Sequence, residues 1–99
     1  LGVKALPQFG FRGERGRFAA VVDFFLPDSR TALEVNGTFW HADPREFPNG
    51  PLHASQRRTL LRYERKLAFL RRQGTPVVEV WEIDFRANPE GSVREALDH

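Results

Sequence analysis

The 99-residue chain contains no cysteine, which excludes disulfide bonds and every zinc site that depends on thiolate ligands. It also lacks any apolar run close to the roughly 20 residues that a membrane-spanning helix requires. No segment resembles a signal peptide. We therefore expect a cytoplasmic chain that does not enter a membrane.

The chain does contain enough apolar material for one folded domain. Hydrophobic residues make up 40% of it and nine are phenylalanine, which favours a globular chain over a disordered one. Its length suits a single domain spanning residues 1–99. Because the chain begins with Leu1 rather than methionine, we expect a domain taken from a longer protein. The net charge is only +2, so the placement of the arginines matters more than the total.

The pattern of apolar, glycine and proline residues predicts an edge strand, three core strands and two helices. The edge strand covers residues 5–10, a polar turn follows over 11–16, the core strands cover 17–26, 32–36 and 77–83, and the helices cover 55–73 and 89–97. Residues 38–52 contain three prolines and are expected to be irregular. This order predicts an α/β fold with a mixed sheet flanked by helices, in which the long helix crosses over to the last strand.

Two acidic residues lie in apolar strands, where a carboxylate is costly unless a partner or a metal offsets its desolvation. Asp23 and Glu34 fall on adjacent predicted strands and are placed to converge on one hard cation, which prefers oxygen ligands. In the alternative reading, Asp23 caps a turn or pairs with an arginine, and Glu34 is exposed to solvent. On spacing alone we weigh the two readings equally.

The loop and the helix that follow offer further candidates. A neutral His41 is able to act as a general base or to bind a phosphate, against the alternative of an ordinary surface histidine. Phe39 and Trp40 are able to wedge into or stack on bases, against the alternative of packing under the loop. The basic helix face is either a phosphate-binding surface or merely solvated; its residues are Arg57, Arg58, Arg62, Arg65 and Lys66.

Three other residues have simpler interpretations. Glu79, on the last core strand, either supplements the metal site or pairs with an arginine of the helix, and we favour the pairing. His53 and His99 are interpreted as ordinary surface residues, since three scattered histidines without cysteine do not form a zinc site.

Several short strings together resemble a known family. They are Asp23-Phe24, the string Gly37-Thr38-Phe39-Trp40-His41, the arginine-rich helix, and a glycine followed by a strand ending in Val80-Trp81-Glu82. This order is similar to that of the very short patch repair (Vsr-like) endonucleases, which belong to the PD-(D/E)xK restriction-endonuclease superfamily. The resemblance covers most of the chain.

The resemblance implies a restriction-endonuclease-like fold and a magnesium-dependent DNA endonuclease or nickase, with Mn²⁺ as a substitute and no zinc. Asp23 matches the metal-binding aspartate and His41 the catalytic histidine. Glu34-Val35-Asn36 resembles the (D/E)xK strand, so Glu34 and the Val35 carbonyl are expected at the metal. Asn36 stands where lysine is commoner, and we expect it to orient water or phosphate.

The resemblance also implies partners and a setting. DNA is the expected partner, with Phe39 and Trp40 matching aromatics that the family inserts beside a mismatch. Family members carry an N-terminal helix with a catalytic acid, for which Glu14 is a poor substitute. We expect the catalytic domain of a homing, mobile-element or DNA repair nuclease, bacterial or phage-like and nucleoid-associated, with targeting domains elsewhere or as a homodimer. The alternative is a catalytically silent nucleic-acid-binding module on the same fold, and a third reading is a structural domain whose acids pair with its own arginines.

Overall fold

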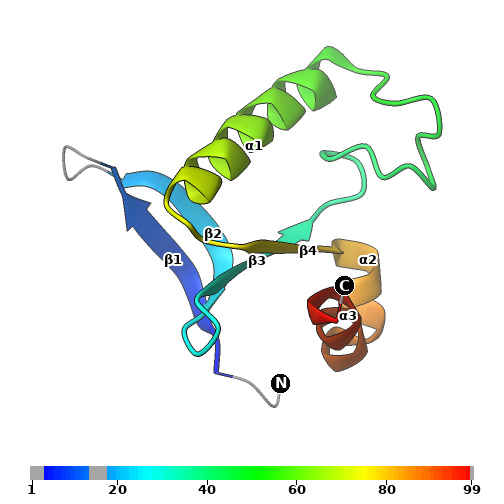
Figure 1. The fold of residues 1–99 in the computed structure, drawn as a ribbon. Coiled ribbons are helices and arrows are strands. Elements are labelled where there is room, and N and C mark those ends of the chain that lie inside the picture. Colours follow the sequence, from blue (N-terminus) through cyan, green and yellow to red (C-terminus); the bar gives the residue numbers. More distant parts are fainter. Residues whose placement is uncertain (1–3, 14–17, 99) are drawn as a thin grey trace.

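The computed structural model describes residues 4–13 and 18–98. Its elements follow the order β1 (Leu6–Arg12), β2 (Phe18–Leu26), β3 (Thr31–Asn36), α1 (Ala54–Arg72), β4 (Val77–Trp81), α2 (Glu82–Ala87) and α3 (Pro89–Leu97). The four strands form one sheet in the order β1-β2-β3-β4 (Figure 1). β1, β2 and β3 pair antiparallel, whereas β3 and β4 pair in parallel. The predicted α/β class with a mixed sheet flanked by helices is confirmed.

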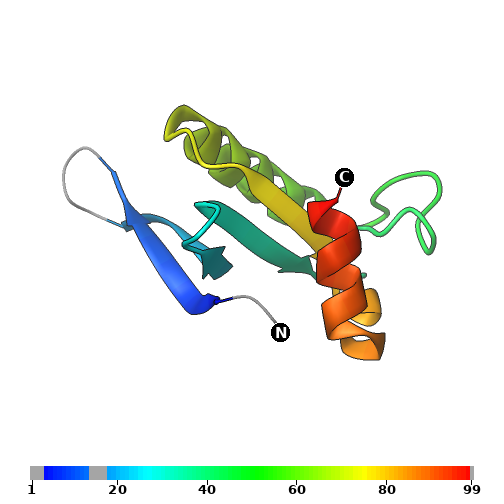
Figure 2. The same cartoon turned by 60° about the horizontal axis from the view of Figure 1, so that its bottom comes forward.

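The helices divide between the two faces of the sheet. Figure 2 shows the sheet between α1 on one side and the pair α2 and α3 on the other. On the α1 side, Val22, Ala32 and Leu70 form a buried core with phenylalanines of β1 and β2. On the other side, Leu33 and Val80 pack against α3. The two inner strands, β2 and β3, are therefore covered on both faces.

The long helix matches its prediction closely because its ends carry clear signals. At its N-terminus, the Gln56 side chain accepts a hydrogen bond from the backbone N–H of His53 at 3.0 Å. At its C-terminus, Gly74 has a φ of +73°, which an L side chain adopts reluctantly. Pro76 then prevents the helix from continuing. No helix in the described ranges is long and apolar enough to cross a membrane.

The second half of β2 departs from simple alternation. Side chains that alternate along a strand would place Phe25 on the opposite face from Ala20 and Val22, but all three pack in the same core. Gln8 lies between the β1 residues paired with Val22 and Phe24 and has a φ of +49°. We attribute the change of face to this kink in β1, because an irregularity in one strand re-aims the neighbouring side chains.

Two predicted strand ends are wrong by two residues each. β1 continues to Arg12, so the predicted turn over 11–16 begins too early, and its residues 14–16 lie outside the described part. The last strand ends at Trp81, two residues earlier than predicted, because Glu82 begins the short helix α2. The sequence analysis missed α2, whose first turn carries acids that suit a helix N-terminus. α3 was predicted correctly, with the Asn88 side chain accepting from the backbone N–H of Gly91.

Candidate functional site

The site begins where β2 and β3 separate. The two strands pair from Leu26–Thr31 to Phe24–Leu33. Beyond this last pair, a side chain on β2 takes the place of the backbone as hydrogen-bond partner of β3. Asp23 Oδ2 accepts a hydrogen bond from the backbone N–H of Val35 at 2.7 Å. Within the described part of the chain, Asp23 therefore neither caps the turn nor pairs with an arginine. Its carboxylate is held at the fork between the strands.

Glu34 lies beside this fork and is buried rather than exposed. Only 3% of the residue is accessible, and its carboxylate forms an ion pair with Lys66 of α1. Burial raises the pKa of Glu34 to about 7, with the nearby Asp23 carboxylate acting in the same direction and Lys66 opposing it. The solvent-exposed alternative for Glu34 is thus wrong, and the structure brings Asp23 and Glu34 together as the metal hypothesis requires.

Lys66 was expected on the DNA-binding face of the helix, but it points to the carboxylates. On a helix, residues three or four positions apart share a face, so Lys66 lies on the same side as Tyr63 and the buried Leu70. This spacing is the sequence signal that was overlooked. Lys66 places a positive charge at the acidic pair from an element other than the strand that carries Glu34.

A chain of hydrogen bonds continues from Asn36. Its side-chain amide donates to Glu79 Oε2 at 3.0 Å and to the Tyr63 hydroxyl at 3.3 Å. The Tyr63 hydroxyl donates to the same Glu79 oxygen at 2.9 Å. The favoured arginine partner for Glu79 is therefore wrong: β4 directs this carboxylate toward α1 at the position of Tyr63. Burial, more than the neighbouring Glu79 charge, raises the pKa of Tyr63 well above its ordinary value.

His41 lies against this chain. Its ring meets the Tyr63 ring edge-on, with the centroids 4.5 Å apart. Partial burial lowers the pKa of His41 below 6.5, and the charge of Lys66 adds to this effect while Glu79 and Asp23 oppose it. Its buried Nδ1 has no hydrogen-bond partner among the described residues. The lowered pKa favours the neutral imidazole, which is able to accept a proton. Because the ring is half-buried and its Nδ1 is buried, the ordinary surface alternative for His41 is wrong.

The loop that carries His41 is fixed at both ends. The buried Gln56 side chain donates to the Phe39 carbonyl at 2.7 Å and accepts from the backbone N–H of Leu52 at 2.9 Å. The buried Asp43 binds the guanidinium of Arg45. Sequence reasoning missed Gln56 and Asp43, since a single amide or acid near a loop is not distinctive.

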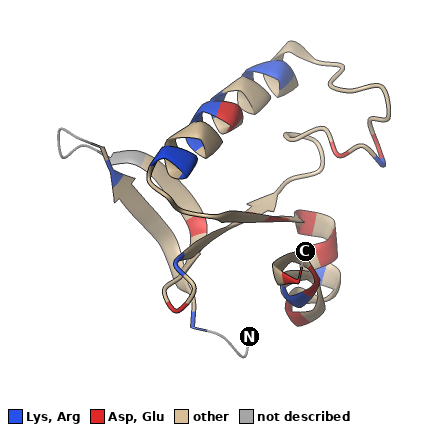
Figure 3. Ribbon diagram, viewed as in Figure 1, with Lys and Arg blue, Asp and Glu red and all other residues tan. Residues whose placement is uncertain are grey.

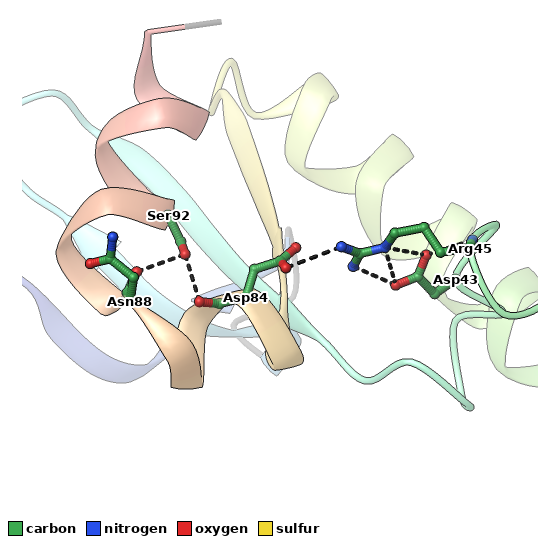
Figure 4. Close-up of polar contacts among 5 residues, drawn as sticks. All are labelled: Asp43, Arg45, Asp84, Asn88 and Ser92. Carbon is green, nitrogen blue, oxygen red and sulfur yellow. Dashed lines mark hydrogen bonds and ion pairs between the residues drawn. The ribbon is translucent and has the colours of Figure 1, made fainter.

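Arg45 also links this loop to the helices on the opposite side of the sheet. Its Nη1 donates to Asp84 of α2 at 3.1 Å, and the Ser92 hydroxyl of α3 donates to the Asp84 carbonyl at 2.7 Å (Figure 4). Hydrogen bonding by Arg45 lowers the pKa of Asp43. The aromatic loop is thereby connected to both α1 and α2.

The other predicted contact residues lie at the surface. Trp40 is 53% accessible and Phe39 41%, so the interpretation of this pair as core is wrong for Trp40, while Phe39 packs partly against Phe47 and His53. Figure 3 shows the basic residues spread along α1. All of the predicted helix arginines are exposed: Arg57, Arg58, Arg62 and Arg65.

The donors at the fork suit a hard cation. The described residues contain no group of three or more histidine, cysteine or acidic side chains able to hold a metal ion, so protein ligands would come from two carboxylates. Asp23 and Glu34 supply oxygen, which Mg²⁺ prefers, and Mg²⁺ commonly retains waters beside one or two carboxylates. The expected backbone ligand is the carbonyl of Val35, the residue that directly follows Glu34 in the chain. The residues present therefore fit a magnesium ion.

Comparison of the chain with models of protein families, with curated proteins and with solved structures found no match. Its function therefore has to be inferred from the chemistry of the site.

Proposed function

We propose that this domain is a metal-dependent DNA endonuclease or nickase that hydrolyses phosphodiester bonds. The observation that carries the proposal is the meeting of Asp23 and Glu34 at the fork of β2 and β3, with Lys66 beside them. A buried carboxylate beside a half-buried one is repelled by it, and the pair favours binding a cation. The resemblance to Vsr-like nucleases points to Asp23, and the resemblance to the (D/E)xK strand of the wider superfamily points to Glu34.

Each residue of the site has a chemical role under this proposal. Asp23 and Glu34 would hold Mg²⁺, which supplies Lewis-acid stabilisation of the phosphate and a more acidic bound water. His41, whose lowered pKa favours the neutral imidazole, accepts a proton from the attacking water. Lys66 stabilises the negative charge that develops on the phosphate, a role that Asn36 cannot fill because its amide is uncharged.

The Asn36 side chain instead supports the site. Together with Tyr63 it binds Glu79, which fixes the Tyr63 ring on which His41 rests. When water attacks phosphorus, the bond to the 3′ oxygen breaks and this oxygen takes up a proton. Hydrolysis then leaves 5′-phosphate and 3′-hydroxyl ends. The exposed arginines of α1 would hold the DNA backbone.

The test is cleavage of supercoiled plasmid by purified protein in Mg²⁺, Mn²⁺ or EDTA. We expect nicking or linearisation that requires the metal and disappears in Asp23→Asn and in Glu34→Gln. Glu64→Gln, on the exposed face of α1, is the matched control and should cleave normally. Metal-dependent cleavage that persists in both site variants would show that the proposal is wrong.

A second candidate is a nucleic-acid-binding module without activity. The observation that favours it is the Lys66–Glu34 ion pair, which neutralises the buried carboxylate without a metal. This candidate predicts duplex binding in EDTA that weakens with salt, together with no cleavage in any divalent metal. Loss of Lys66 separates the two readings: Lys66→Met should abolish cleavage by a nuclease but leave binding by a silent module nearly unchanged.

A further inference from the structure

A hollow surface leads from the acidic fork to the aromatic loop. A pocket of about 340 Å³ is lined by Asp23 and Val35 together with Glu82 and Arg86 of α2. A second pocket of about 480 Å³ is lined by Trp40 and Ile83, and it shares Glu82 and Arg86 with the first. The two pockets are therefore neighbours, and the second lies beyond Arg86 as seen from Asp23.

Two of the side chains that line the second pocket are large, apolar and exposed. Trp40 is 53% accessible and Ile83 is 58% accessible. An exposed indole beside an aliphatic side chain suits a flat ring, since base–aromatic stacking contributes roughly 1–3 kcal/mol per base. The volume also falls within the roughly 300–1,000 Å³ of typical ligand pockets. A base paired inside a duplex cannot enter, because its faces are covered by its neighbours, so the pocket suits an unpaired base.

Two charged side chains at this pocket are only weakly paired with each other. Arg86 Nη2 and Glu82 Oε2 are 3.6 Å apart, one turn of α2 apart in sequence, and the side chains are 76% and 48% accessible. This separation is too long for a good hydrogen bond. Glu82 therefore retains the capacity to accept hydrogen bonds from a ligand, and Arg86 to contact a phosphate.

The carboxylate selects among the bases by its hydrogen-bonding chemistry. A carboxylate has two acceptor oxygens and no donor. The Watson–Crick edge of guanine presents two parallel donors, the N1–H and the 2-amino group, whereas adenine and cytosine each pair one amino donor with a ring acceptor. Thymine presents one donor between two carbonyl acceptors. Guanine is therefore the base that can direct two donors at the Glu82 carboxylate without placing an acceptor lone pair against a carboxylate oxygen.

We propose that the pocket between Trp40 and Ile83 binds one unpaired guanine nucleotide, with its base read by Glu82 and its phosphate held by Arg86. This inference rests on the proposed function, because it takes DNA as the ligand, and it adds the substrate feature that directs a strand to the acidic fork. The domain then prefers DNA with an extruded or single-stranded guanine near the bond to be cut.

The test is DNA binding measured by fluorescence anisotropy in EDTA, where no cleavage occurs. The probes are fluorescein-labelled duplexes that differ only at one bulged nucleotide: guanine, inosine, adenine, cytosine or thymine, beside a fully paired duplex. We expect bulged guanine to bind at least about fivefold more tightly than bulged thymine, as for a good bidentate base contact. Inosine lacks the 2-amino group and should lose most of this advantage.

Variants of the protein assign the preference to the pocket. Glu82→Gln should bind all bulged probes with similar affinity, because the amide presents a donor where guanine needs an acceptor. Trp40→Ala should weaken every bulged probe by about fivefold or more while leaving the paired duplex unchanged. Glu64→Gln and Leu61→Ala replace exposed residues of α1 and are the matched controls, which should preserve the preference.

Equal affinity for bulged guanine and thymine, or a preference that survives Glu82→Gln, would overturn the inference and leave the nuclease proposal standing. A protein that prefers bulged guanine but never cleaves DNA would retain the pocket and lose the nuclease. Failure to bind any of the probes would remove both.

Discussion

Replacing the buried Glu34 with glutamine should stabilise the domain relative to wild type by more at pH 8 than at pH 5. Glutamine has the shape of the protonated carboxyl group but cannot ionise. In the folded chain, the pKa of Glu34 is raised from 4.5 to about 7, mainly by burial. Between these two values the folded chain binds more protons than the unfolded chain, so its stability falls as the pH rises and then levels off above pH 7.

The size of this effect follows from the two pKa values. At about 1.4 kcal/mol for each pH unit of difference, the fully ionised Glu34 costs the folded domain about 3 kcal/mol. Some of this cost is already present at pH 5, because the unfolded chain is partly ionised there. The remaining change between pH 5 and pH 8 is about 2–3 kcal/mol. The Glu34→Gln variant escapes it, so the difference in unfolding free energy between variant and wild type should shift by that amount.

The assay is urea denaturation of both proteins at several pH values, followed by tryptophan fluorescence. Groups that titrate equally in the two proteins cancel in the difference. Glu64→Gln is the control, because Glu64 is exposed on α1, and its difference from wild type should not change with pH. A Glu34→Gln difference that stays constant from pH 5 to pH 8 would show that burial does not shift this carboxyl group.

Other consequences of the site are open to direct measurement. Mg²⁺ at about 100 times its Kd should stabilise the wild type by about 2.7 kcal/mol, and Glu34→Gln by less, in thermal melts at pH 8. Gln56→Ala removes the amide that binds Phe39, Leu52 and His53 backbones and should cost about 2–3 kcal/mol in urea denaturation, whereas the exposed Gln73→Ala should cost little. Because burial lowers the pKa of His41, kcat/KM for cleavage should rise with pH and then level off. The midpoint of this rise should lie below pH 6.5. Asp43→Asn should be destabilising at pH 7, and this deficit should vanish as the pH falls below 3.8, since the pKa of Asp43 is lowered by Arg45.

Local sequence patterns predicted the parts of the fold that local physics determines. The long helix was recognised because its apolar stripe, glycine and proline all lie within one segment, and α3 because Asn88 and Pro89 stand together at its start. α2 was missed because Ile83 and Phe85 look like a continuation of the apolar strand before them. The kink at Gln8 has no signal in the sequence, since glutamine rarely adopts a positive φ.

The candidate site was predictable only where its residues lie on adjacent strands. Asp23 and Glu34 were placed together because alternation and a short turn determine which side chains meet. Glu79 was assigned to an arginine because its position opposite Glu34, and so near Asn36, depends on the parallel pairing of β3 with β4, which follows a crossover of some forty residues. Contacts across such a connection depend on the packing of α1, which no local pattern specifies.

Under the proposed function, Lys66 supplies the positive charge that a lysine on the acidic strand would otherwise provide, and Asn36 takes a supporting role. The Asn36 position lies on the same face as Glu34, but its side chain is directed to Glu79 and Tyr63. A lysine there would meet the Glu79 carboxylate as well as Glu34, and its charge would be shared between them. Lys66 reaches Glu34 from α1, so the cation and the acids come from different elements. Under the proposed function, the charge at the site therefore depends on how α1 packs over the sheet, because Lys66 pairs with Glu34 from that helix.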